Sequence, residues 1–123
     1  MAIVGVIIAE SLRVGSVLEG VNLAVSKVSP ADACDLEAGQ PRTWTYLDFE
    51  ADDADAGALA TALEDVLERE GGWYCDFRND TETFVVFAGR TFRYPRRDKS
   101  GRGAAADYAR SVGVPEPQLD WPE

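Results

Sequence analysis

The sequence predicts an α+β fold: a mostly antiparallel sheet of about five or six strands with two helices. Short runs of aromatic and β-branched residues follow one another with turn-like joints between them, as in an antiparallel meander. Two other segments carry apolar residues at intervals of three and four, which is typical of helices packed on a sheet. The chain has 123 residues, the size of one domain, and we expect a single domain over residues 1–123.

The first part of the chain is expected to form two strands and a loop. Residues 2–9 are the longest apolar run and are too few to cross a bilayer, so a buried strand is the simplest interpretation. Residues 21–26 alternate between apolar and polar side chains, as in a strand with one buried face. Val28 is out of this phase, which indicates a bulge or an early strand end. Residues 29–42 are expected to form a loop.

A further strand and the longer helix follow. Period-two alternation in the strand 43–50 separates two sets of side chains, a core set of Thr45, Leu47 and Phe49 and an outer set of Trp44, Tyr46 and Asp48. Residues 54–70 have one apolar stripe at helical spacing. Asp53 is a suitable N-cap for this helix, and Gly71 is expected to end it.

The second half predicts a meander and a C-terminal helix. The runs 73–77, 82–87 and 90–94 are expected to form three antiparallel strands. Residues 84–87 are apolar on both faces, which favours a central strand covered on both sides. Residues 103–112 are expected to form the second helix, and both helices are expected on one face of the sheet. The proline-rich tail should run extended, held to the domain by Leu119 and Trp121.

The chain contains no histidine, which excludes several kinds of site. Ser-His-Asp and Cys-His nucleophile pairs cannot form within one chain, and neither can zinc sites built on histidine. The two cysteines, Cys34 and Cys75, form no C-x-x-C pair, and neither standard nucleotide-binding loop is present. We therefore expect no metal site and no cofactor, and carboxylate, phenol and guanidinium groups remain as the route to catalysis.

Charge and cysteine content indicate the setting of the protein. The net charge is −10, from 22 acidic and 12 basic side chains, which disfavours binding to nucleic acid. The low cysteine content favours a reducing compartment, so a cytoplasmic location is expected. The first residues lack the basic start and cleavage site of a signal peptide, so no association with a membrane is expected.

One candidate site lies on the strand that begins near Trp73. Alternation places Trp73, Cys75 and Phe77 on one face and Tyr74, Asp76 and Arg78 on the other. If the first set is buried, the second presents a phenol, a carboxylate and a guanidinium that could supply acid–base chemistry or hold a small polar ligand. An exposed charge ladder is the alternative. For Cys75, we favour a buried thiol without a chemical role.

The other candidate site is a basic segment in an otherwise acidic chain. Residues 90–102 hold six basic side chains against one acid, Asp98. Six residues of this segment are candidates for binding an anion at the start of the second helix: Arg90, Arg93, Arg96, Arg97, Ser100 and Arg102. A solvated loop whose arginines pair with surplus acids is the alternative.

The block GGWYCDFRNDTETFVVFAGRTFRYP, over residues 71–95, resembles a pattern found in small uncharacterised bacterial proteins, of the form WYxDF…VVF…FxY. The resemblance covers about a fifth of the chain. It implies a compact soluble bacterial protein and transfers no activity or catalytic residue.

We favour a small acidic, non-catalytic binding or regulatory domain, and an inhibitor of a basic protein partner is one concrete form of it. The alternative is a protein that binds a small anionic ligand, or an enzyme that uses tyrosine, aspartate and arginine for acid–base chemistry without histidine. A homodimer through an edge strand is also compatible with an open sheet of this size.

Overall fold

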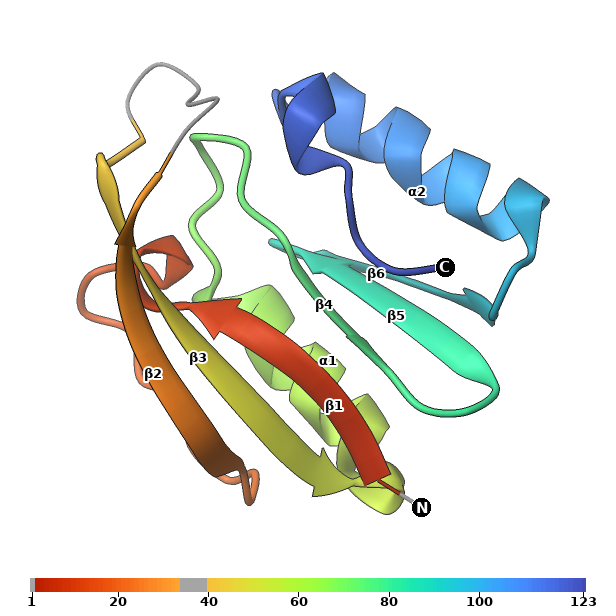
Figure 1. The fold of residues 1–123 in the computed structure, drawn as a ribbon, viewed down its shortest axis with the longest axis horizontal. Coiled ribbons are helices and arrows are strands. Elements are labelled where there is room, and N and C mark those ends of the chain that lie inside the picture. The colour runs from red at the N-terminus through yellow and green to blue at the C-terminus, as the bar shows by residue number, and fades with distance from the viewer. Residues whose placement is uncertain (1, 34–39) are drawn as a thin grey trace.

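The computed structural model describes residues 2–33 and 40–123 and has the predicted α+β architecture (Figure 1). One six-stranded sheet has the order β2-β3-β1-β4-β5-β6, and all neighbouring strands are antiparallel. The strands are β1 (Ala2–Ile8), β2 (Ala24–Asp32), β3 (Thr43–Asp52), β4 (Cys75–Arg78), β5 (Glu82–Phe87) and β6 (Arg90–Pro95). The helices are α1 (Ala56–Val66) and α2 (Lys99–Ser111). None of the helices within the described residues is long and apolar enough to cross a membrane.

The two helices pack on opposite faces of the sheet, so the expectation of one shared face was wrong (Figure 1). Phe84 and Val86 join a core with α1, whereas Val85 and Phe87 join a second core with α2 and the C-terminal tail. Alternating residues of a strand point to opposite faces, so one strand supplies both cores. The prediction that β5 is a central strand covered on both faces is therefore confirmed.

Strand β2 begins and ends later than predicted. The register with β3 shifts between Val25 and Lys27, which confirms a bulge in this strand. Pairing then continues as far as Asp32 opposite Thr43, through residues expected to form a loop. Pro30 is tolerated there because β2 is an edge strand and one of its sides needs no ladder hydrogen bond. The rest of the predicted loop includes residues 34–39, and Cys34 with them, which lie outside the described residues.

Helix α1 ends four residues earlier than its apolar stripe predicts. Leu67 leaves the helix with extended dihedral angles and forms an isolated antiparallel bridge with Leu12. Two backbone hydrogen bonds hold this bridge, from Arg13 N to Val66 O at 2.7 Å and from Glu68 N to Ser11 O at 2.8 Å. Pairing with a segment distant in sequence therefore replaces the last helical turn.

Helix α2 begins at Lys99, earlier than the predicted residue 103. The Asp98 side chain caps it by accepting a hydrogen bond from Ser100 N at 3.1 Å. Gly101 allows the first turn to lie against Tyr94, because a Cβ atom on Gly101 would come within 2.4 Å of the Tyr94 Cβ. The tail then crosses β4, β5 and β6. Its residue Trp121 is buried in the core formed with α2, which confirms the predicted anchoring role of Trp121.

Candidate functional site

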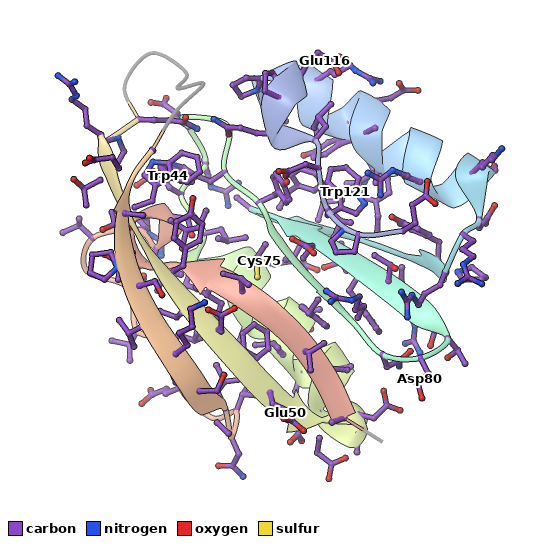
Figure 2. All side chains as sticks on the ribbon, viewed as in Figure 1. Trp44, Glu50, Cys75, Asp80, Glu116 and Trp121 are labelled. Atoms are coloured by element: carbon purple, nitrogen blue, oxygen red, sulfur yellow. The ribbon has the colours of Figure 1, made fainter. Side chains whose placement is uncertain are left out.

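Among the described residues, the half of the sheet formed by β2, β3 and β1 is covered by a helix on one face only, the face that packs on α1. Strands β2, β3 and β1 lie in front of α1 in Figure 1, while α2 and the tail lie on the side of β6. The side chains of this half that point away from α1, together with Arg78 of β4, are called the open face: Val4, Val6, Lys27, Ser29, Tyr46, Asp48, Glu50 and Arg78. Figure 2 shows Glu50 and Trp44 toward opposite ends of β3.

The open face combines apolar side chains with two acids, Asp48 and Glu50, and two basic residues, Lys27 and Arg78. Val4 is 39% exposed and lies opposite Glu50 on β3, while Val6 lies opposite Asp48. A shallow groove of about 210 Å³ includes these four residues and Arg78 in its lining. Val4 thus lies between Glu50 and Arg78, next to the partly buried Val6, so apolar area and charged groups of both signs meet in this groove.

A second hollow adjoins the open face where β2 and β3 approach the tail. Its volume is about 220 Å³, and we call it the aromatic–carboxylate pocket. Its lining consists of Asp32, Ala33, Trp44, Tyr46, Tyr74, Pro117, Gln118 and Asp120. The pocket therefore brings together residues from β2, from β3, from the approach to β4 and from the C-terminal tail.

The aromatic wall of this pocket is fixed by packing. Trp44 lies on the predicted outer side of β3 but is only 7% exposed, because its ring packs 5.1 Å from that of Trp73. Its indole Nε1 donates to Pro41 O at 2.9 Å, and its ring centroid lies 6.4 Å from that of Tyr46. Trp44 thus presents a preorganised ring rather than a mobile exposed one.

The C-terminal tail closes the other side of the pocket. The Tyr74 hydroxyl donates to Gln118 O in a short hydrogen bond. Arg102 donates to Trp121 O at 2.7 Å, and its guanidinium lies 4.7 Å from the centroid of the Trp121 ring. The Trp121 indole in turn donates to the Tyr94 hydroxyl at 2.7 Å. These contacts hold the tail on both sides of Asp120, which is itself exposed.

Burial changes the acidity of two groups beneath the tail. Desolvation raises the pKa of Tyr74, and the Asp76 and Asp120 carboxylates raise it further. Desolvation also raises the pKa of Asp76 to about 6, although the nearby Arg78 opposes this change. Tyr74 is therefore a phenol that stays protonated, and Asp76 titrates near pH 6.

Asp76 interacts electrostatically with both Tyr74 and Arg78, so the structure keeps the predicted row of Tyr74, Asp76 and Arg78 together along β4 and the residue before it. Tyr74 and Asp76 lie beneath the tail and interact electrostatically with Asp120 and Arg102. Arg78, at the far end of the row, also lines the groove on the open face. Cys75 points to the opposite side of β4, where it is 2% exposed and its pKa is raised by burial, as expected for a thiol without a chemical role.

The basic segment is dispersed over the surface. Arg90 lies over the rings of Phe92 and Tyr108, at 4.6 Å and 4.9 Å from their centroids. Arg93 forms two hydrogen bonds with the Glu82 carboxylate, at 2.6 Å and 2.7 Å.

The remaining members of the segment lie near the start of α2. Arg96 donates to Glu123 O at 3.0 Å and 3.1 Å. The Ser100 backbone N–H donates to the carboxylate of Asp98, the residue that caps α2. Arg97 and Arg102 line a pocket of about 240 Å³ together with Lys99, but two carboxylate residues, Asp98 and Glu123, line it too. The structure thus brings two of the six candidates to one pocket, and that pocket has mixed charge.

Only Tyr74 and Arg78 of the open face and its pocket were among the predicted site residues; the acids Asp32, Asp48, Glu50 and Asp120 were not. The alternation of Trp44, Tyr46 and Asp48 gave a signal for this side of β3. The path of the tail is set by tertiary contacts, so no local pattern could place Asp120 beside β3.

Comparison with known proteins gives no match to a family model, to a curated protein or to a solved structure. Among residues 2–33 and 40–123, no group of three or more potential metal-ligating side chains is placed to hold a metal ion.

Proposed function

We propose that this protein is a non-catalytic interaction domain that binds a basic protein partner through the open face. The observation that carries the proposal is the open face itself, where Val4 and Val6 of β1 lie beside the carboxylates of Glu50 and Asp48 on β3. Apolar area supplies binding free energy, and surrounding acids attract and orient a partner of opposite charge. The net charge of −10 adds long-range attraction for the same class of partner.

The contacts beneath the tail support a binding role over a catalytic one. Tyr74 donates its hydroxyl to the tail backbone, and Arg102 is also engaged with the tail. These are two of the groups that acid–base chemistry without histidine would need. Their use in anchoring the tail favours a structural role for them.

Differential capture tests the proposal. The wild-type protein and the Asp48→Lys/Glu50→Lys variant are used as baits, and retained proteins are identified by mass spectrometry. We expect a basic protein that the wild type retains and the variant loses, because the variant places repulsive charge at the centre of the contact. The captured protein is then purified and titrated into the wild type by calorimetry, with an expected stoichiometry of 1:1.

The matched control is Asp80→Lys/Glu70→Lys, which makes the same change in charge at two exposed positions outside the open face. This control should retain the partner. If both variants lose the partner equally, net charge alone explains the binding, and the assignment of the binding surface to the open face is contradicted. If the wild type self-associates and the Asp48→Lys/Glu50→Lys variant does not, the open face binds a second copy of this chain, and the proposal of a basic partner is contradicted.

A further inference from the structure

The aromatic–carboxylate pocket carries a more specific inference, which rests on the proposed function. Three aromatic residues and two acids line it: Trp44, Tyr46, Tyr74, Asp32 and Asp120. Faces of aromatic rings attract cations, and carboxylates accept charge-assisted hydrogen bonds from ammonium and guanidinium groups. We propose that this pocket binds the cationic end of an arginine or lysine side chain presented by the basic partner.

The charge around the pocket favours a cation. The described lining contains no lysine or arginine. Asp76 lies close enough to raise the pKa of Tyr74 and to be affected by the charge of Asp120, so it adds negative potential behind the pocket. Arg78 and Arg102 are positive groups near Asp76. Arg102 is directed to the backbone of the tail and to the Trp121 ring, and Arg78 lines the groove on the open face.

The size and rigidity of the pocket also fit one side-chain end. A volume of about 220 Å³ is the share of roughly seven water molecules in the liquid, which accommodates a guanidinium and its adjoining methylenes. Trp44 is held by Pro41 and Trp73, and Tyr74 is held by Gln118. Because these groups are already fixed, little conformational entropy is lost when a cation enters.

Titration with a model compound tests the pocket separately from the partner. N-acetyl-arginine-N-methylamide is added to the ¹⁵N-labelled protein, and the indole N–H resonance of Trp44 is followed by NMR. We expect a saturable shift with a millimolar dissociation constant, a common range for so small a ligand. N-acetyl-citrulline-N-methylamide has nearly the same shape without the charge and should bind at least tenfold more weakly.

Two variants test whether the carboxylates of the pocket are responsible for arginine binding. Asp32→Asn/Asp120→Asn should weaken arginine binding at least fivefold, whereas Asp80→Asn/Glu70→Gln, with the same change in net charge, should stay within about twofold of the wild type. The melting temperature of each variant verifies that it is folded. Equal shifts with arginine and citrulline, no saturable shift of Trp44, or equal weakening in both variants would overturn the inference.

The Asp48→Lys/Glu50→Lys variant separates this inference from the proposed function. Its substitutions lie outside the pocket lining, so arginine binding should remain within about threefold of the wild type even where the partner is lost. Failure of the arginine titration overturns the pocket inference and leaves the capture result standing. Failure of the capture experiment overturns the proposed function and leaves arginine binding by the pocket standing.

Discussion

Asp76 has an environment unlike that of an ordinary surface carboxylate. It lies beneath the tail, where desolvation raises its pKa from 3.8 to about 6. Arg78 and Arg102 favour its charged form, while Asp120 disfavours it. The balance means that the folded protein binds a proton on Asp76 at pH values where the unfolded chain has released it. Linkage then requires this carboxyl to destabilise the fold increasingly as the pH rises from 3.8, with the full effect present above about 6.

Asp76→Asn should therefore stabilise the protein at pH 7 and have little effect at pH 4. The gain at pH 7 has an upper bound of about 3 kcal/mol, the free energy equivalent of the raised pKa. Urea unfolding of both proteins between pH 4 and pH 8 measures the difference. A free energy difference that is constant over this range would contradict the described environment of Asp76.

Gly101 and Gly103 of α2 form a matched pair that tests local packing. A methyl group at Gly101 would clash with Tyr94, whereas a methyl group at Gly103 meets nothing within 4 Å. Gly101→Ala should destabilise by about 1–3 kcal/mol through overpacking. Gly103→Ala should stabilise by about 0.5–1 kcal/mol through helix propensity. Thermal unfolding of the two variants tests this, and equal effects would contradict the close approach of α2 to β6.

At the scale of elements, the C-terminal tail completes the second core. Trp121 is 3% exposed, packs edge to face with Tyr74 at 5.3 Å and belongs to the core formed with α2. Trp121→Ala should reduce the free energy of unfolding by about 3–5 kcal/mol, as expected for a buried large side chain. Trp121→Phe keeps much of the ring and should cost less. Chemical denaturation gives both values, and a loss below about 1 kcal/mol for alanine would contradict the anchored tail.

The positions of most elements could be predicted from periodicity and turn residues, but several ends could not. Leu67 continues the apolar stripe of α1, yet it is drawn out of the helix by its bridge with Leu12. Pro30 and its neighbours resemble a loop, yet an edge position in the sheet lets them pair with β3. In both cases a partner far away in sequence decides the structure, and a local pattern carries no information about that partner.

At the scale of the whole molecule, the sequence predicted the strands and helices but not their distribution over two faces. Helices on opposite faces leave the outer side of β2, β3 and β1 without a helix among the described residues. The sequence showed that Trp44, Tyr46 and Asp48 share a side of one strand, which is part of the candidate site. The rest of the site joins β1, β2 and the tail through the fold, so composition and spacing could not assemble it.

The measurement that tests the central claim most directly is a side-chain footprint of the captured partner on the open face. Methyl NMR spectra of the valine-labelled protein are recorded with and without that partner. Val4 and Val6 line the groove on the open face. Val14 and Val17 are 97% and 68% exposed, in a connection that Leu12 and Leu18 hold against the α1 core, and they serve as exposed controls. Shifts or broadening at Val4 and Val6 with unchanged signals from Val14 and Val17 are predicted, and the reverse pattern would contradict binding through the open face.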